Sequence, residues 1–121
     1  MTEQLAQRFF DAIERGDVDA VGAIYAPDAV IWHNDDALET SREENLEVLR
    51  NFVAHTAERH YEQRRVAAFD GGFVQQHALR IVGPNGGQRT IHAAIICQVV
   101  DDRITRLDEY FDPAQIQPSR R

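Results

Sequence analysis

The sequence predicts a single α+β domain, with three N-terminal helices on one side of a curved antiparallel sheet. Three observations support this prediction. Apolar residues recur at helical spacing over the first 25 residues, Ser41 and Glu44 form a capping-box pair, and strand-like runs separated by turn residues follow. Long antiparallel strands curl, and a curled sheet with helices at its mouth encloses a pocket.

The first 26 residues predict a hairpin of two short helices. Thr2 can cap the first helix, Gly16 can end it, and Asp17 can cap the second, which ends before Pro27. The apolar residues at helical spacing are Leu5, Ala6, Phe9, Phe10 and Ile13 in the first helix, and Val18, Val21, Ile24 and Tyr25 in the second.

One strand and a third helix come next. Residues 29–33 are β-branched and aromatic enough to form a strand, which the polar run Asn34-Asp35-Asp36 ends. The capping box predicts a helix from Ser41 to about Ala57. Its apolar face consists of Leu46, Leu49, Phe52 and Val53.

The rest of the chain is strand-like. Glycine, asparagine and aspartate turns divide it into four expected strands at 62–69, 73–82, 88–100 and 104–112. Turn residues at these spacings indicate successive antiparallel hairpins. We treat 1–121 as one domain and expect residues 113–121 to form a flexible C-terminal tail.

Composition restricts the function classes. A net charge of −7 argues against nucleic acid or an anionic membrane as a partner, because both bind basic patches. No apolar run approaches the roughly 20 residues that span a bilayer. The single cysteine, Cys97, and an N-terminus unlike a signal peptide are typical of a cytoplasmic protein, which is the location we expect.

The final strand carries the most informative residue. Strand alternation places Thr105, Leu107, Glu109 and Phe111 on one face, and Ile104, Arg106, Asp108 and Tyr110 on the other. Glu109 therefore lies between two large apolar side chains. An unpaired carboxylate on an apolar wall is costly, so such a group has a partner, a raised pKa or a catalytic task.

Three runs resemble the SnoaL-like and ketosteroid-isomerase-like families of the nuclear-transport-factor-2-like superfamily. They are residues 7–20 (QRFFDAIERGDVDA), residues 25–30 with 32–34 (YAPDAV, WHN) and residues 108–112 (DEYFD). The resemblance covers nearly the whole chain and implies a cone-shaped α+β fold around a deep pocket. That fold hosts isomerases, cyclases, hydrolases, dehydratases and inert binding proteins, so it does not fix the reaction.

The steroid isomerases use an aspartate base and an oxyanion hole made of a tyrosine and a protonated aspartic acid. Their tyrosine aligns with Phe9 here, their base with His33, and their protonated acid with a position near Ile96. Phenylalanine and isoleucine cannot donate a hydrogen bond. The resemblance therefore does not extend to steroid isomerisation by that route.

The limonene-epoxide-hydrolase-like branch uses an Asp-Arg-Asp set together with a tyrosine and an asparagine. Its closing aspartate aligns with Glu109, while its arginine and second aspartate fall near His77 and Leu79. Its tyrosine and asparagine resemble Trp32 and Asn34. Both family comparisons place Glu109 on the pocket-facing side of its strand.

Histidines are the candidate proton-transfer partners of Glu109, because imidazole titrates near neutral pH. His33 and His77 are the best candidates, and His92 would lie near the pocket rim if Ile96 faces the pocket. Alternation leaves open whether His33 or the pair Trp32 and Asn34 points inward. No metal-ligand spacing or phosphate loop is present, so we expect neither a metal nor another cofactor.

These observations favour a small cofactor-free enzyme that performs acid–base chemistry on a small apolar, oxygen-bearing molecule. The expected catalytic residues are Glu109, His77 and His33, and the expected substrate-binding residues are Phe9, Tyr25, Trp32, Asn34, Phe52, His92 and Phe111. The alternatives are a non-catalytic binder of a small hydrophobic ligand and an interaction module with a plugged pocket.

The outer face of the predicted sheet has no helix left to cover it. Its residues on the last strand mix charge with apolar and aromatic groups, as in Ile104 and Tyr110. Such a face is typical of a subunit interface. We therefore expect a homodimer formed through the outer sheet face, with Arg106 and Asp108 in reciprocal ion pairs.

Overall fold

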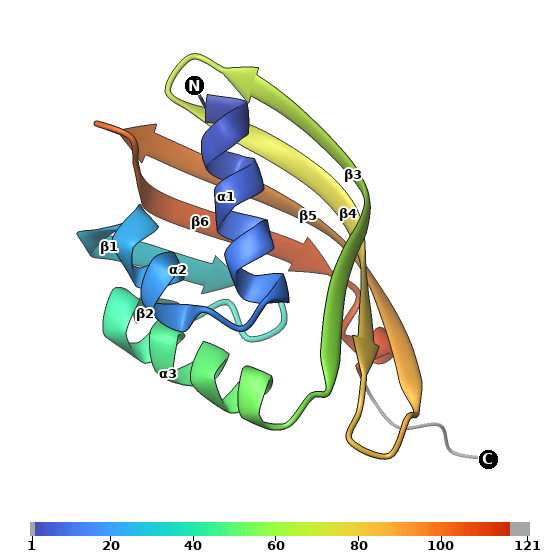
Figure 1. Ribbon diagram of the computed structural model, residues 1–121. Helices are drawn as coiled ribbons and strands as arrows, with labels where there is room; N and C mark the ends of the chain where they lie inside the picture. The colour runs from blue at the N-terminus through green and yellow to red at the C-terminus, as the bar shows by residue number, and fades with distance from the viewer. Residues whose placement is uncertain (1, 117–121) are drawn as a thin grey trace.

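The computed structural model describes residues 2–116 and confirms the predicted α+β fold class, with three helices against a curved, unclosed sheet of six strands (Figure 1). The elements in chain order are α1 (Thr2–Glu14), α2 (Val18–Ile24), β1 (Tyr25–His33), β2 (Glu39–Ser41), α3 (Arg42–Ala54), β3 (Glu58–Phe69), β4 (Gly72–Val82), β5 (Gln88–Val100), β6 (Arg103–Phe111) and a 3-10 turn, η1 (Pro113–Gln115).

The sheet order is β2-β1-β6-β5-β4-β3, and one pairing differs from the prediction. β3 to β6 form the expected antiparallel hairpins, whereas β1 runs parallel to β6. The sheet is therefore mixed rather than wholly antiparallel. Parallel strands need a long connection. The segment from β2 to β5 connects β1 to β6, so no local turn signal could reveal that these two strands pair.

Two of the three helix N-caps predicted from the sequence are present, whereas Thr2 is the first residue of α1 itself. The side chain of Asp17 accepts a hydrogen bond from the backbone N–H of Ala20, and Ser41 and Glu44 form a reciprocal capping box. α3 ends at Ala54 rather than near Ala57, because β3 already begins at Glu58. β2 was not predicted, since three residues are too few to show a period.

Three strand pairings contain irregularities that change which way side chains point, the first of them in β1–β6 between Tyr25 and Val30. In β3 the pairing shifts between Glu62 and Arg65, and Gln63 has a φ of 54°. In β5–β6 the register shifts between Gln98 and Val99. Extra residues of this kind bend a strand and reverse its alternation. Ile104 is consequently fully buried in the core, not on the outer face where simple alternation put it.

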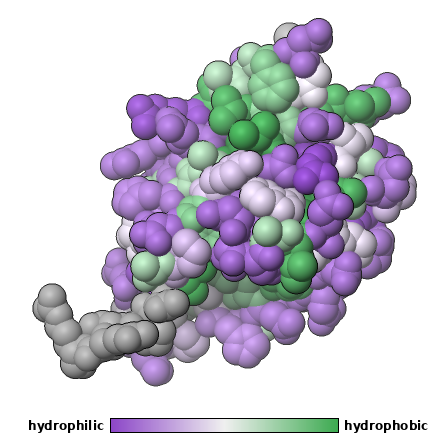
Figure 2. All heavy atoms as spheres, turned by 180° about the vertical axis from the view of Figure 1, so that it is seen from behind, coloured by the Kyte–Doolittle hydropathy of each residue, from purple (hydrophilic) through white to green (hydrophobic). Residues whose placement is uncertain are grey.

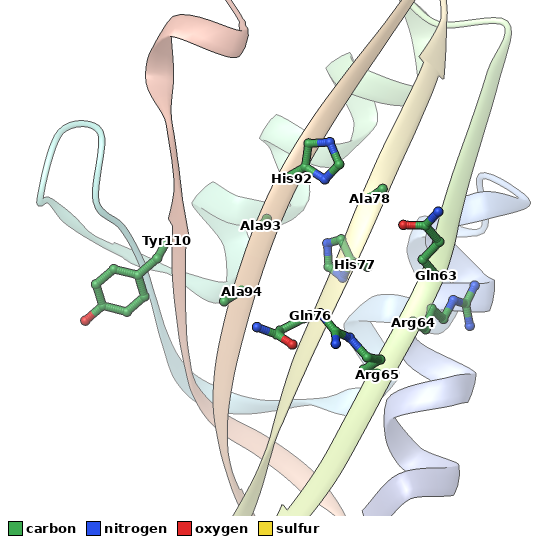
Figure 3. A pocket seen from close by; sticks show the side chains of 10 residues that line it. All are labelled: Gln63, Arg64, Arg65, Gln76, His77, Ala78, His92, Ala93, Ala94 and Tyr110. Carbon is green, nitrogen blue, oxygen red and sulfur yellow. The ribbon is translucent and has the colours of Figure 1, made fainter.

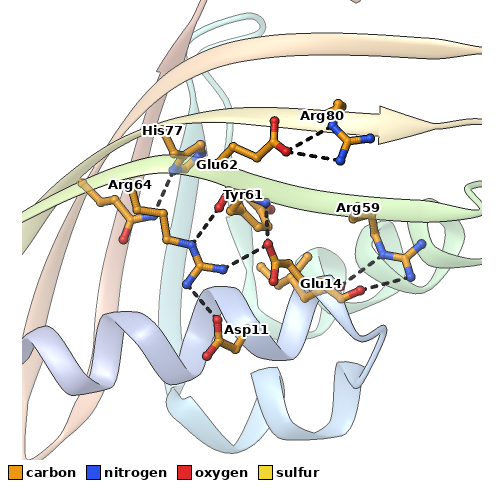
Figure 4. Close-up of polar contacts among 10 residues, drawn as sticks. Asp11, Glu14, Arg59, Tyr61, Glu62, Arg64, His77 and Arg80 are labelled. Atoms are coloured by element: carbon orange, nitrogen blue, oxygen red, sulfur yellow. Dashed lines mark hydrogen bonds and ion pairs between the residues drawn. The ribbon is translucent and has the colours of Figure 1, made fainter.

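The β3 irregularity is fastened to α1 by a polar clamp (Figure 4). The guanidinium of Arg64 lies 2.8 Å from a carboxylate oxygen of Asp11 and 3.1 Å from one of Glu14. Glu14 also accepts a hydrogen bond from the backbone N–H of Tyr61 at 2.6 Å. Buried Arg59 donates to the carbonyl groups of Ile13 and Glu14, where the dipole of α1 favours a positive charge.

The core is concentrated under α1. Phe9 and Phe10 are buried with their rings 5.1 Å apart, edge to face, and they belong to one apolar cluster with Phe73. In α3 the buried residues are only Asn45 and Leu46. The helix that covers the other half of the concave face thus buries much less of its surface.

The chain after β6 folds back over the sheet as far as Ile116. The side-chain oxygen of Gln115 accepts a hydrogen bond from the backbone N–H of His92 at 2.9 Å. Of the tail expected at 113–121, residues 113–116 are seen in this turn, and 117–121 lie outside the described residues. Within residues 2–116, none of the helices has the length and apolar character to cross a membrane.

Candidate functional site

A cavity of about 250 Å³ lies between α3 and the concave face of the sheet. Most of its wall is aliphatic or aromatic, and its polar groups come from four residues. The lining residues are His33, Asn45, Val48, Leu49, Phe52, Tyr61, Leu79, Ile81, Ile91, Ala93, Glu109, Phe111 and Ile116. An apolar cavity with a few convergent polar groups is the usual form of a small-molecule site.

Glu109 and His33 meet at the wall of this cavity. The parallel register of β1 and β6 pairs His33 directly with Glu109, and Nε2 of His33 lies 3.0 Å from Oε1 of Glu109. The side chains of His33 and Glu109 are 30% and 21% exposed, so solvent reaches both although most of each side chain is buried. The structure therefore brings together two of the three residues predicted to be catalytic.

Asn34 holds the ends of these two strands together. Its side-chain amide donates to the carbonyl of Phe111 and its side-chain oxygen accepts from the N–H of Phe111, both at 3.0 Å. The backbone N–H of Asn34 also donates to the carbonyl of Glu109 at 3.1 Å. These three bonds fix the register next to the pair. The side chain of Asn34 thus contacts the backbone of Phe111. It does not line the cavity, although the sequence predicted that it would bind the substrate there.

The ion pair favours the charged form of His33. The hydrogen bond to Glu109 raises the pKa of His33 above its ordinary value, partial burial opposes this change, and the charges of Glu109, Asp35 and Asp36 add to it. At neutral pH a larger fraction of His33 is protonated than in a free histidine. The pair can therefore hold a proton between an imidazole nitrogen and a carboxylate oxygen.

His77, the third residue predicted to be catalytic, lies apart from this pair. It is 5% exposed, and its ring packs edge to face against Phe10 and Tyr61 at centroid distances of 5.2 and 4.7 Å. It belongs to β4 on the concave side of the sheet, and it does not line the cavity. Burial lowers its pKa to about 4, so the imidazole is neutral at pH 7.

Two polar residues of the cavity were not predicted. Asn45 accepts a hydrogen bond from the hydroxyl of Tyr25 at 2.8 Å, which leaves its NH₂ group available as a donor. Tyr61 lines the cavity, and burial raises the pKa of its hydroxyl, which therefore stays protonated. The signal for Asn45 was its position beside Leu46 on the apolar face of α3. Tyr61 was missed because the strand was predicted to begin one residue later, at Glu62, whereas β3 begins at Glu58.

Apart from Asn34, the residues predicted to bind substrate lie in the cavity lining, in the core or on the outer side of the sheet. Phe52 and Phe111 line the cavity. Phe9 and Tyr25 are in the core, with their rings 5.4 Å apart.

Trp32 and His92 lie outside the cavity lining, unlike the prediction. Trp32 packs on Tyr110 at a centroid distance of 5.1 Å, on the side of the sheet opposite His33. His92 is exposed on the same side as Ile96, which is 38% exposed. His92 and Ile96 do share a face of the sheet, as alternation required, but it is the outer face and not the pocket face.

A second depression, of about 480 Å³, lies on this outer face (Figure 3). Gln76, His92 and Tyr110 contribute to it from β4, β5 and β6, and the β3 irregularity adds Gln63 and Arg65. His77 borders it where the irregularity separates β3 from β4. It lacks a carboxylate–imidazole pair, so we place the candidate site in the inner cavity. Within the described part of the chain, no three histidine, cysteine or acidic side chains are grouped to hold a metal ion.

Comparison with solved structures identifies proteins that share this fold over nearly the whole chain. A candidate polyketide cyclase from Xanthomonas campestris pv. campestris superposes with a TM-score of 0.82 at 23% identity, covering 96% of both chains. A protein of unknown function with the nuclear-transport-factor-2-like fold from Burkholderia pseudomallei K96243 gives 0.81 at 20% identity, covering 95% of this chain and 93% of that one.

An epoxide hydrolase from M. tuberculosis that resembles limonene epoxide hydrolase gives a TM-score of 0.79 at 18% identity, covering 93% of this chain and 83% of that one. These identities establish a shared fold and no more. A search of curated proteins finds no significant match to the sequence. The sequence itself matches the SnoaL-like domain over residues 6–107, and the protein is therefore a member of the SnoaL-like domain family.

Proposed function

We propose that this protein is a small acid–base enzyme that acts on a carbonyl, hydroxyl or epoxide compound held in the inner cavity. The observation that carries the proposal is the pair of His33 and Glu109, 3.0 Å apart at the wall of an otherwise largely apolar cavity. An acid and a base in hydrogen-bond contact beside a ligand-sized space can remove a proton from one atom and return it to another.

In this mechanism Glu109 is the base and His33 is its proton-transfer partner. The carboxylate of Glu109 takes a proton from a carbon or oxygen of the ligand, and the imidazolium of His33 supplies a proton to the atom that becomes negative. The NH₂ group of Asn45 and the hydroxyl of Tyr61 are additional donors at the wall.

The size and wall of the cavity indicate the substrate class. Its volume of about 250 Å³ is slightly below the range of ~300–1,000 Å³ that accommodates drug-sized ligands. The wall beside Phe52 and Phe111 is apolar. A ligand of one or two rings with a single oxygen function fits these limits.

Exchange of α-protons tests the proposal without knowledge of the natural substrate. Cyclohexanone and 2-tetralone in D₂O report proton removal from carbon by the loss of their α-proton NMR signals. We expect the protein to accelerate this exchange and Glu109→Gln to reduce the acceleration by about 10²–10⁴-fold, the usual contribution of a positioned base. His33→Gln should also reduce it.

Glu47→Gln is the matched control, because Glu47 lies on the exposed face of α3 and outside the cavity lining. Its exchange rate should equal that of the wild type. If Glu109→Gln folds, by circular dichroism, and exchanges both ketones as fast as the wild type, Glu109 is not the base. If the wild type does not accelerate exchange of either ketone, proton removal from carbon is not its reaction.

The second candidate function is binding of a small hydrophobic ligand without turnover. Most of the cavity wall is aliphatic or aromatic, and hydrophobic burial alone can retain such a ligand. A complex with 2-tetralone detected by NMR, with no acceleration of exchange, would favour this function. The third alternative, a plugged pocket, predicts no space of ligand size.

We also propose that two copies associate through the outer face of the sheet. That face carries Ile96 and Tyr110, which are 38% and 46% exposed, and Figure 2 shows apolar groups interspersed with polar ones on it. Arg106 pairs with Asp108 and Glu39 of its own chain, so the reciprocal ion pairs expected from the sequence are not needed.

Light scattering tests the dimer. A mass near 27.6 kDa, twice the 13.8 kDa of one chain, is expected at micromolar concentration. Ile96→Arg should give the monomer mass, whereas Leu38→Arg, an exposed residue of the β1–β2 loop, should not. A wild-type mass near 13.8 kDa contradicts the proposal. The expected cytoplasmic location stays a prediction that cell fractionation can test.

A further inference from the structure

A groove adjoins the inner cavity beyond the C-terminal end of α3. It has a volume of about 610 Å³ and lies between the end of α3, the turn from β4 to β5, and Ile116. Four apolar residues line both the groove and the inner cavity, namely Phe52, Ile81, Ile91 and Ile116. The two spaces are therefore neighbours along a shared apolar wall.

Strand β5 runs from the groove into the cavity. Arg89, Ile91, Ala93 and Ile95 alternate onto one face of this strand. Arg89 and Ile91 line the groove, whereas Ile91 and Ala93 line the cavity. Ile95 is paired with Glu109 on β6. Six residues of β5, roughly 20 Å of strand, therefore separate the position of Glu109 from that of Arg89.

Two hydrogen bonds hold Ile116 at the boundary of the two spaces. Arg89 donates one to the carbonyl of Ile116, and the side chain of Gln115 accepts one from the backbone N–H of His92 at 2.9 Å. Both bonds fasten the end of η1 to β5, and Figure 1 shows the turn beside that strand. The side chain of Ile116 lines both spaces, so a ligand that extends from one into the other passes against it.

The charge of the groove lining has one sign. Arg89 and His55 are its ionisable residues, and none of its lining residues is acidic. Arg89 forms no ion pair within residues 2–116. Its Nη1 is bonded to the carbonyl of Ile116, which leaves Nε and Nη2 as donors. On a chain with a net charge of −7, this groove is a local site that favours an anion.

The inner end of the cavity has the opposite preference. The carboxylate of Glu109 disfavours a second carboxylate there, because like charges repel at short distance. The apolar residues shared by cavity and groove suit hydrocarbon rather than a charged group. The arrangement fits an elongated molecule whose charged end is in the groove.

We propose that the inner cavity and the groove together bind an aliphatic oxo or hydroxy acid, with its chain against Ile116 and its carboxylate on Arg89. The proposal deepens the proposed function and rests on it in placing the reacting oxygen function beside Glu109. A guanidinium offers paired N–H donors that match the two oxygens of a carboxylate. The natural ligand is then longer than the inner cavity holds alone.

Unbranched acids of increasing length test whether the groove is used. NMR titration with hexanoate, octanoate and decanoate should show affinity rising about fourfold for each added methylene group, because the added carbons enter an apolar space. The methyl resonances of Ile91 and Ile116 should shift on binding, whereas those of Ile96, on the outer face, should not.

Arg89→Gln tests the position of the carboxylate. We expect it to weaken octanoate binding about fivefold, the upper value for an exposed ion pair. It should leave binding of 1-octanol, which has the same chain and no charge, unchanged. Arg103→Gln is the matched control, because Arg103 is an exposed arginine of β6 outside both linings, and its octanoate affinity should equal that of the wild type.

A measurement on the wild type covers the case in which Arg89→Gln does not fold. The ¹⁵N resonance of Nε of Arg89 should shift on addition of octanoate and not on addition of 1-octanol. A resonance that neither compound moves, or an affinity independent of chain length, would overturn the proposal. An equal loss of octanoate and 1-octanol binding in Arg89→Gln would also overturn it, because Arg89 would then act only by holding Ile116.

Two further outcomes concern the occupant and the proposed function. Methyl resonances of Ile91 and Ile116 that shift with protein concentration and not with acid would make a second copy of the chain the occupant and refute the acid. Glu109→Gln removes the base and leaves the groove, so octanoate binding should persist while α-proton exchange is lost. If exchange depends on Glu109 but octanoate binding is unchanged in folded Arg89→Gln, the groove assignment fails and the acid–base proposal stands. The reverse result refutes the base and retains the acid-binding groove.

Discussion

The two halves of the concave sheet face differ in how completely their helices fill them. Under α1, Phe9, Phe10 and Phe73 form a solid core of nearly inaccessible side chains. Under α3, Leu49 and Phe52 are only partly buried and border a cavity of about 250 Å³. The partly exposed pair of His33 and Glu109 is found in the half with the cavity.

The sequences of the two helices account for this difference. α1 places two consecutive phenylalanines toward the sheet and is fastened to β3 through Arg64 and Arg59. α3 places Asn45 and Leu46 toward the sheet, and Asn45 is engaged with Tyr25. Polar groups that must meet a ligand cannot be covered by a closely packed helix, so the candidate site lies where packing is incomplete.

Phe10→Ala should have the largest effect, because it removes a ring from the filled half. We expect the free energy of unfolding to fall by about 3–5 kcal/mol, the usual cost of deleting a fully buried phenylalanine ring. Urea denaturation followed by circular dichroism measures this change. A loss below about 1 kcal/mol would show that the α1 half is not closely packed.

Acidification should destabilise the protein through His77, at the edge of the filled half. Its pKa is about 4 in the folded state and near 6.5 in the unfolded chain, so below pH 6.5 the unfolded state binds the extra proton. Stability is therefore lost as pH falls. From pH 7 to 5 this contribution should be about 2 kcal/mol.

The measurement is the difference in unfolding free energy between the wild type and His77→Leu at the two pH values. Other titrating groups are present in both proteins and cancel from this difference. An identical pH dependence in the two would show that His77 is protonated as readily in the folded protein as in the unfolded chain.

Phe52→Ala is the matched change in the hollow half and should cost less than Phe10→Ala. The ring of Phe52 is partly buried and already borders empty space, so we expect a loss of about 1–2 kcal/mol. Urea denaturation under the same conditions gives the comparison. Equal losses for the two phenylalanines would remove the distinction between the halves.

His33 should show the smallest effect and the opposite pH dependence. Its pKa is raised in the folded state by the hydrogen bond to Glu109, so its stabilising contribution is complete below about pH 6.5 and is lost as pH rises through the folded-state value. His33→Gln should remove this decline, measured as the unfolding free energy at pH 6 and 8. A wild type that gains stability relative to His33→Gln over this range would contradict the assignment.

The sequence alone determined the features that depend on neighbouring residues. Asp17 and the Ser41–Glu44 box set helix starts, because a cap bonds to backbone within the next turn. The position of Glu109 between apolar residues also followed from alternation, and the structure places it in the lining of the cavity. The family resemblance and the cone-like α+β fold were likewise evident before the structure.

Only the tertiary structure decided which residues meet Glu109. The parallel pairing of β1 with β6 placed His33 beside Glu109. These two strands are far apart in the sequence, so no local signal encodes their contact. The β6 irregularity buries Ile104, and pairing with the neighbouring strands puts His92 and Trp32 on the outer side of the sheet. Alternation is a local property, but its phase relative to the core depends on pairing with distant strands.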